Sequence, residues 1–180
     1  MNEELEILKT VCTRLQDAGI PYMITGSTAL NFYATPRMTR DIDIVIEIQM
    51  QDADRIFQIF HGPFYSDLQM IREAIEQEGM FNLIHTELAF KIDFIIRKNH
   101  LYRKVEFARR QKIRVSGTDL WLVSPEDLIL SKLFWAKDSL SQLQLGDVSN
   151  LLQMLKDLDT PYIEKWVHEL KLDFLWNRVK

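Results

Sequence analysis

The chain of 180 residues lacks the features of secreted, membrane-spanning and repeat proteins. Its only cysteine, Cys12, cannot form an internal disulfide, which is typical of a protein from a reducing compartment. No run comes near the roughly 18 apolar residues of a membrane span, and the residues after Met1 are acidic where a signal peptide would be basic. These absences predict a cytoplasmic protein without a membrane partner.

A large excess of charge of one sign is also missing, because the net charge is −4. This balance argues weakly against a general polyanion-binding protein. The basic residues are unevenly distributed, since eight of the 22 lie between Arg97 and Arg114 with one acid, Glu106, among them. Such a run is usually a solvated helix face, but a surface that binds RNA or phosphate has the same composition. Both interpretations stay open.

The spacing of apolar residues predicts helices alternating with strands up to residue 123 and helices alone after it. The expected helices cover 3–18, 28–34, 52–61, 67–78, 99–110, 125–137 and 145–158, and a helical pair follows from residue 160. The expected strands cover 21–25, 41–48, 80–85, 88–97, 112–115 and 119–123. Ser27 or Thr28 is the expected N-cap of the second helix. The sequence thus predicts an α/β (α+β) fold with 1–123 as its core and 124–180 as a helical C-terminal lobe packed on that core.

Acidic side chains gather on one face of two expected strands. Strand side chains alternate between faces, so Asp41 and Asp43 point the same way while the isoleucines between and after them point the other way. Two like charges so close repel each other, and a fold keeps such a pair where a cation compensates it. Asp93 repeats the arrangement on a strand whose opposite face is apolar. A divalent metal is the simplest cation for these acids, although a lone Asp-x-Asp pair is also common on solvent-exposed edge strands.

A glycine turn precedes the acids and favours phosphate binding. Gly26 lets the backbone approach a ligand closely, and Ser27, at the start of the expected helix, adds a hydroxyl donor next to unpaired N–H groups. Three basic residues could contact a triphosphate: Arg37, Arg40 and Lys132. Each has a plainer interpretation, since the arginines could be solvated loop charges and the lysine could reach water or an ion-pair partner from its apolar helix.

Together these residues resemble the nucleotidyltransferase superfamily of DNA polymerase beta, in which a Gly-Ser turn, an Asp-x-Asp pair and a later strand acid recur. The more specific resemblance is to the AbiEii toxin-like branch of minimal nucleotidyltransferases. It depends on the segment Arg37-Met38-Thr39-Arg40-Asp41-Ile42-Asp43, the helix start Pro125-Glu126-Asp127, Lys132 and Asp147-Val148. The resemblance covers residues 21–155, and its first half is the more specific.

The resemblance implies a nucleotidyltransferase fold, with a mixed β-sheet flanked by helices, and an enzyme that moves an NMP from an NTP to an acceptor hydroxyl while pyrophosphate leaves. The implied ligands of two Mg²⁺ ions, with Mn²⁺ as an alternative, are Asp41, Asp43 and Asp93. The implied nucleotide-binding residues are Gly26, Ser27, Arg37, Arg40 and Lys132. The acceptor would be RNA, a protein or a small molecule. The branch also implies a toxin–antitoxin or phage-defence role with a cognate partner protein.

One departure from the toxin-like pattern supports a different function. The pattern has an arginine a few residues before the distal acid, whereas residues 141–146, before Asp147, contain none. The alternative is therefore a catalytically inactive module that keeps the fold and binds RNA or a partner protein through the basic segment 97–114.

Overall fold

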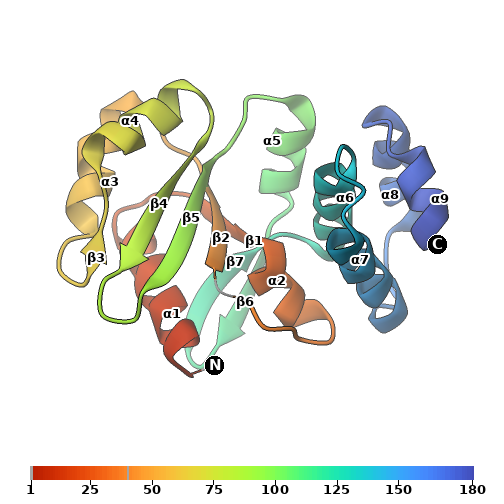
Figure 1. Ribbon diagram of the computed structural model, residues 1–180, viewed down its shortest axis with the longest axis horizontal. Coiled ribbons are helices and arrows are strands. Elements are labelled where there is room, and N and C mark those ends of the chain that lie inside the picture. Colours follow the sequence, from red (N-terminus) through yellow and green to blue (C-terminus); the bar gives the residue numbers. More distant parts are fainter. Residues whose placement is uncertain (1, 40) are drawn as a thin grey trace.

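The computed structural model describes residues 2–39 and 41–180, and a seven-stranded sheet forms its centre (Figure 1). The strand order is β3-β4-β5-β2-β1-β7-β6. The strands are β1 Tyr22–Thr25, β2 Asp41–Ile46, β3 Phe64–Tyr65, β4 Met80–His85, β5 Phe90–Ile96, β6 Gln111–Val115 and β7 Thr118–Leu122. β2 and β5 are parallel, as are β1 and β7, and the other neighbours are antiparallel. The predicted α/β fold with a mixed sheet is confirmed.

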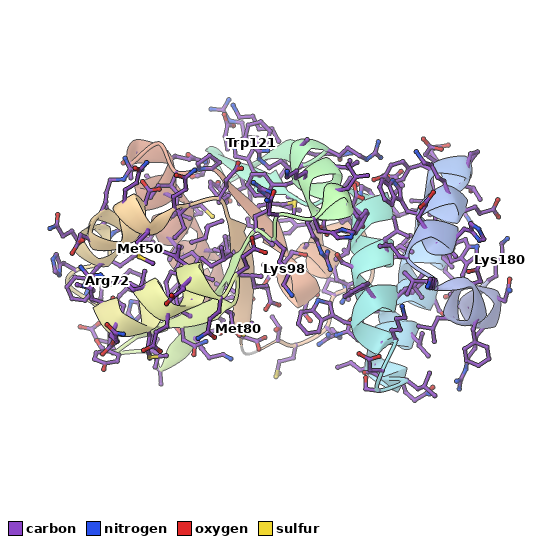
Figure 2. All side chains as sticks on the ribbon, turned by 90° about the horizontal axis from the view of Figure 1, so that it is seen from above. Met50, Arg72, Met80, Lys98, Trp121 and Lys180 are labelled. Carbon is purple, nitrogen blue, oxygen red and sulfur yellow. The ribbon has the colours of Figure 1, made fainter. Side chains whose placement is uncertain are left out.

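Helices cover the sheet and continue beyond it. They are α1 Asn2–Asp17, α2 Gly26–Tyr33, α3 Ala53–Ile59, α4 Leu68–Glu76, α5 Leu101–Ala108, α6 Pro125–Ala136, α7 Gln142–Met154, α8 Thr160–Glu169 and α9 Asp173–Val179, with a short turn η1 Met50–Asp52 before α3. Figure 1 places α3 and α4 near β3 and groups α6 to α9 at the opposite end. In Figure 2, Arg72 of α4 and the C-terminal Lys180 mark these two ends. Within the described residues, no helix is both long and apolar enough to cross a membrane.

The alternation of strand residues decides which face of the sheet is buried. Ile42, Ile44 and Ile46 of β2 are fully buried, whereas the residues between them are partly exposed. The same core continues through β5, α1 and α6. Burial raises the pKa of the Cys12 thiol to about 12, so this cysteine is inert and serves packing. The boundary between 1–123 and 124–180 lies inside this continuous core and stays a prediction.

Several boundaries differ from those predicted. α2 begins at Gly26 with Thr25 as its N-cap, so the prediction of Ser27 or Thr28 as the cap is wrong. Gly26 has a φ of +62°, which glycine adopts without strain, so β1 turns directly into the helix with no loop between them. α7 begins at Gln142, earlier than predicted, because the Ser141 hydroxyl accepts a hydrogen bond from the N–H of its first turn. The unpredicted strand β3 has two residues, too few to show a periodic pattern.

Candidate active site

β2 carries two carboxylates into a cavity of about 450 Å³. Asp41 and Asp43 both line it, together with residues of the β1–α2 turn and of α6. Thr39 positions Asp41, because the Thr39 hydroxyl donates to Asp41 Oδ1 at 2.9 Å. Asp43 pairs in register with Thr25 of β1 on one side and with Asp93 of β5 on the other. The structure therefore brings two of the three predicted acids into one cavity and places the third beside them.

Asp93, the third predicted acid, is buried and already has two partners. Its exposed fraction is 6%. Asn82 of β4 donates a hydrogen bond to Asp93 Oδ1, and Lys91 Nζ lies 2.7 Å from Oδ2. The hydrogen bond to Asp93 raises the pKa of Lys91. Lys91 also pairs in register with Asp41. Its ammonium therefore lies on the face of the sheet that carries Asp41, Asp43 and Asp93, which we call the acidic face.

The acidic face keeps an excess of negative charge despite Lys91. Burial, and then the neighbouring carboxylates of Asp41 and Asp93, raise the pKa of Asp43 to about 6. A cation beside Asp43 would relieve this repulsion, and carboxylate oxygens are ligands that Mg²⁺ prefers. Across residues 2–39 and 41–180, no group of three His, Cys, Asp or Glu side chains is arranged to hold a metal ion. Asp41 and Asp43 are thus the residues that would hold a divalent ion, while Lys91 occupies one oxygen of the Asp93 carboxylate.

The β1–α2 turn lies beside these carboxylates. Gly26 and Ser27 line the same cavity as Asp43. The N-cap residue Thr25 makes no side-chain hydrogen bond to the first N–H groups of α2. A helix N-terminus carries a partial positive charge, which favours phosphate oxygens. The turn therefore places N–H groups that suit phosphate oxygens beside the Asp41 and Asp43 carboxylates.

Replacing Gly26 with alanine tests how closely this turn is packed. A Cβ at Gly26 would overlap the Asp43 carboxylate, and φ there is +62°. Gly19 has a similar φ of +65°, but its Cβ would meet nothing within 4 Å. We expect Gly19→Ala to lower the free energy of unfolding by about 1 kcal/mol and Gly26→Ala by roughly 1–3 kcal/mol more. Urea denaturation measures both variants, and equal losses would show that contact with Asp43 is not what requires glycine.

A buried ion-pair network also borders the cavity. Asp147 of α7 accepts hydrogen bonds from Arg37 Nε and Nη2, each at 3.0 Å. Lys132 Nζ of α6 lies 2.7 Å from Asp147 Oδ2, and Lys132 is 3% exposed. Burial lowers the pKa of Lys132. Burial acts to raise the pKa of Asp147, but the hydrogen bonds from Arg37 and Lys132 outweigh it and hold that pKa below its usual range. Arg37 thus brings a guanidinium to Asp147 from a distant segment of the chain.

The predicted nucleotide-binding residues are largely brought together. Gly26, Ser27, Arg37 and Lys132 line the 450 Å³ cavity, and Arg37 Nη2 donates to Ser27 Oγ at 2.5 Å. Arg40 lies outside the described residues. The residues that sequence reasoning missed are Thr39, Asn82, Lys91 and Gln144, the last of which accepts a hydrogen bond from Lys132 Nζ at 3.2 Å. Strand alternation placed Lys91 on the face of Asp93, and Thr39 belongs to the segment that carries the family resemblance, but nothing local marks Asn82 or Gln144.

Internal ion pairs neutralise most of the basic segment 97–114. The pairs are Arg97–Glu47, Arg103–Glu106, Arg109–Asp127, Lys112–Asp119 and Arg114–Asp119. Five of the eight cations therefore have carboxylate partners in the chain. Arg110 packs its guanidinium over the rings of Phe107 and Trp121. Only Arg97 and Arg109 pair with acids of other elements, since the remaining pairs lie within α5 or within the β6–β7 hairpin. Pairing therefore reduces the positive charge that this segment offers to a polyanion without removing it.

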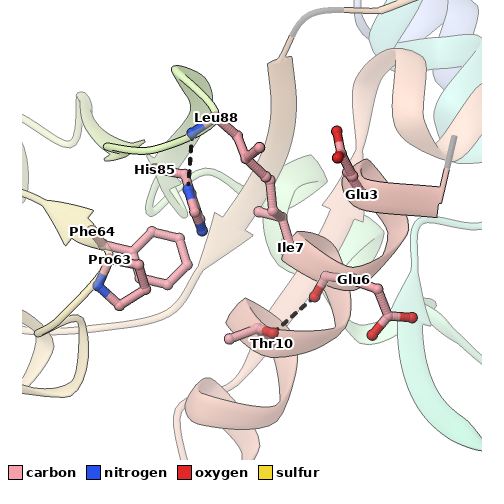
Figure 3. Close-up of a pocket in the computed structure, with 8 residues that line it drawn as sticks. All are labelled: Glu3, Glu6, Ile7, Thr10, Pro63, Phe64, His85 and Leu88. Atoms are coloured by element: carbon pink, nitrogen blue, oxygen red, sulfur yellow. Dashed lines mark hydrogen bonds between the residues drawn. The ribbon is translucent and has the colours of Figure 1, made fainter.

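A second cavity, of about 290 Å³, lies between α1 and the end of β4 (Figure 3). Its lining residues are Glu3, Glu6, Ile7, Thr10, Pro63, Phe64, His85 and Leu88. His85 Nδ1 accepts a hydrogen bond from the Leu88 N–H at 3.4 Å, and its ring packs edge-on against Phe64. These contacts give His85 a structural role. The predicted site residues that the structure describes all lie elsewhere.

Solved structures of other proteins share this fold. The chain is similar to an antigenic nucleotidyltransferase-like protein from Paracoccidioides brasiliensis, with a TM-score of 0.57 and 16% identity over 83% of this chain and 73% of that one. It is similar to the lincosamide antibiotic adenylyltransferase LnuA bound to lincomycin, with a TM-score of 0.56 and 14% identity over 86% of this chain and 98% of that one. It is also similar to ANT(2″)-Ia in complex with adenylyl-2″-tobramycin, with a TM-score of 0.55 and 14% identity over 97% of this chain and 99% of that one. At these identities the likeness shows the fold alone.

One family matches the chain over nearly its whole length, from residue 2 to residue 178. No curated protein matches it. The family match includes the β1–α2 turn, the acids of β2 and β5, and the ion-pair network of α6 and α7. The chain belongs to the family described as nucleotidyltransferase of unknown function (DUF6036).

Proposed function

We propose that this nucleotidyltransferase moves an NMP from an NTP to an acceptor hydroxyl, with the 450 Å³ cavity as its active site. One observation carries the proposal: the Asp41 and Asp43 carboxylates share this cavity with the Gly26–Ser27 turn. Carboxylates bind the metal of a metal–triphosphate complex, and a helix N-terminus binds phosphate oxygens. Both ends of a metal-bound triphosphate therefore find partners in one cavity.

The phosphate side of the cavity combines a turn with two cations. Gly26 lets the backbone approach the phosphates, and Ser27 can donate its hydroxyl to them. Arg37 and Lys132 share the single Asp147 carboxylate, so they leave one net positive charge at the cavity, which would stabilise the charge of the departing pyrophosphate. Arg40 stays a candidate for a further triphosphate contact.

On the acidic side, Asp41 and Asp43 would hold Mg²⁺, or Mn²⁺ in its place. When bound, the ion neutralises triphosphate charge and lowers the pKa of a coordinated hydroxyl. A second ion requires the Asp93 carboxylate, which Lys91 now holds. In this proposal Asp93 orients the acceptor hydroxyl and accepts its proton.

Replacing Lys91 with methionine is expected to strengthen the binding of a second ion. The ammonium competes for Asp93 Oδ2, 2.7 Å away, so its removal frees one carboxylate oxygen. We expect the second Mn²⁺ to bind about tenfold more tightly, the scale on which neighbouring side chains alter metal affinity. Electron paramagnetic resonance of a Mn²⁺ titration, with a non-hydrolysable NTP analogue present, counts the ions. Lys112→Met removes a pair of the same length with Asp119 and is the matched control. If the dissociation constant of the second Mn²⁺ is unchanged in the Lys91 variant, Lys91 does not compete with the ion for Asp93.

Calorimetric titration of each non-hydrolysable NTP analogue, with and without Mg²⁺, tests the proposed site. We expect at least one analogue to bind with an affinity that depends on the metal. Absence of metal-dependent binding, together with salt-sensitive binding of RNA, would instead identify an inactive RNA-binding module. The pairing of the basic segment 97–114 within the chain makes that module the weaker candidate.

The acceptor decides the biological role. RNA, a protein and a small molecule each carry a suitable hydroxyl, and LnuA, which shares the fold, is an antibiotic adenylyltransferase. An AbiEii-like place in a toxin–antitoxin or phage-defence pair, with a cognate partner protein in the cytoplasm, stays part of the proposal. Incubation of labelled NTP with cell RNA, cell protein and a small-molecule extract would show which fraction becomes labelled.

A further inference from the structure

A third cavity, of about 230 Å³, adjoins the proposed active site. Four residues line both cavities: Thr25, Ile95, Ser131 and Trp135. We call it the apolar cavity, because its lining includes Val45, Ile95, Ile96, Phe134 and Trp135. The two cavities are therefore neighbouring compartments of one site.

The strand register fixes the distance between the apolar cavity and the acids. Val45 follows Asp43 by two residues on β2, and Ile95 follows Asp93 by two residues on β5. Val45 and Ile95 pair with each other as Asp43 and Asp93 do. Residues two apart on a strand share a face and are separated by roughly 7 Å. A ligand resting on Val45 and Ile95 could thus present a hydroxyl to the carboxylates.

Three of the five charged residues that line the apolar cavity already have ion-pair partners. Arg103 pairs with Glu106 at 2.8 Å, donates to Ser131 Oγ at 2.7 Å and stacks its guanidinium over Phe134. Arg97, which also lines the cavity, pairs with Glu47 outside it at 2.5 Å. Lys98 and Asp138, one cation and one anion, also line the cavity, and neither has an ion-pair partner among the described residues. A phosphate group would have to break the pairs of Arg97 and Arg103 or depend on Lys98 alone beside the carboxylates of Glu106 and Asp138, whereas an uncharged group meets neither cost. The lining therefore favours a neutral ligand over a polyanion.

Two aromatic side chains that line the apolar cavity are also exposed to solvent. Trp135 is 62% exposed and Phe134 is 41% exposed, whereas Trp166 and Trp176 are nearly buried. A large aromatic side chain left in contact with water beside a cavity is available to pack on a ligand ring. Because Trp135 lines both cavities, it can contact the acceptor while the nucleotide is bound.

We propose that the apolar cavity is the acceptor subsite, and that it takes a small, uncharged hydroxyl compound with an aromatic or aliphatic ring. This inference rests on the function proposed above. The acceptor oxygen forms a bond to the α-phosphorus as the bond from that phosphorus to the bridging oxygen breaks. Pyrophosphate leaves, and the hydroxyl proton passes to a carboxylate of the site.

Naphthyl ethanol, an uncharged aryl alcohol, is the probe for this proposal. It is titrated into protein saturated with a non-hydrolysable ATP analogue and Mg²⁺, and the amide signals of Ile95 and Ile96 are followed by NMR. We expect these signals to shift. Trp135→Ala should weaken the binding by about tenfold, the value of one aromatic contact. Trp121→Ala, on β7 beneath Arg110, is the control and should leave the affinity unchanged.

Three results would overturn the proposal. Shifts that fall outside the apolar cavity, or an affinity unaffected by Trp135→Ala, would show that the probe binds elsewhere. Stronger binding of naphthyl phosphate, or of a single-stranded RNA oligonucleotide, at Ile95 and Ile96 would assign the cavity to an anionic acceptor. The affinity of the ATP analogue, measured in the same samples, shows whether the acceptor subsite alone or the whole proposed function is wrong. If the analogue binds and the probe does not, only the acceptor subsite is wrong; if the analogue does not bind with Mg²⁺, the proposed function is wrong.

Discussion

Asp43→Asn is expected to weaken metal-dependent binding of an NTP analogue by about a hundredfold or more, because changes near a metal ligand already cost 10–100-fold. Asp43 lines the cavity between Thr25 and Asp93 and supplies one of the two carboxylates that fit the ion. An amide keeps the shape of the side chain and removes its charge. Calorimetry with and without Mg²⁺ measures the loss.

The same substitution should leave the fold intact. Burial and neighbouring carboxylates raise the pKa of Asp43 to about 6, so the charge that it carries at neutral pH is less favourable in the folded protein than in the unfolded chain. Removing the charge therefore should not lower the free energy of unfolding. Asp54→Asn changes an exposed acid paired with Arg72 at 3.2 Å and is the matched control for binding. Metal-dependent binding that survives in the Asp43 variant would contradict the assigned site.

Asp147→Asn is expected to lower the free energy of unfolding by about 3 kcal/mol, the usual loss when one partner of a buried ion pair is removed. Asp147 accepts hydrogen bonds from Arg37 and stands 2.7 Å from Lys132, whose exposed fraction is 3%. Without the carboxylate, the Lys132 ammonium stays buried and the Arg37 guanidinium loses its bidentate partner. Urea denaturation at neutral pH measures the effect.

A second substitution shows that the buried ammonium causes this loss. In Asp147→Asn combined with Lys132→Met, the uncompensated charge is gone, so the double variant should be more stable than Asp147→Asn alone. Asp173→Asn, at the exposed start of α9, should change the free energy of unfolding little. Purely additive losses would show that Lys132 and Asp147 act independently.

Local patterns were sufficient to predict most of the fold and the centre of the site. The alternation of acids and isoleucines on β2 predicted which face is buried, and the apolar face of β5 predicted that Asp93 would stand beside Asp43. The Ser124-Pro125 start predicted α6 correctly, and the Ser124 hydroxyl accepts a hydrogen bond from the N–H of Asp127. These features depend on interactions between residues close together in the chain, so they can be predicted from the sequence.

Contacts between distant segments were not predictable in the same way. Arg37 and Asp147 are 110 residues apart, so nothing near Asp147 indicated that an arginine from the loop before β2 would pair with it. Two ion pairs of the basic segment were equally hidden, because the acids that neutralise Arg97 and Arg109 belong to other elements. Composition alone therefore overstated the positive surface of this segment.

The central claim is that the α-phosphoryl group of an NTP, together with its nucleoside, is transferred to an acceptor hydroxyl. Parallel incubations with α-labelled and γ-labelled NTP, in the presence of Mg²⁺ and a cell extract, test it most directly. We expect the α label to appear on an acceptor and the γ label to be recovered as pyrophosphate, with neither product formed by Asp43→Asn. Transfer of the γ label to the acceptor, or the absence of labelled acceptor with every NTP, would contradict the account.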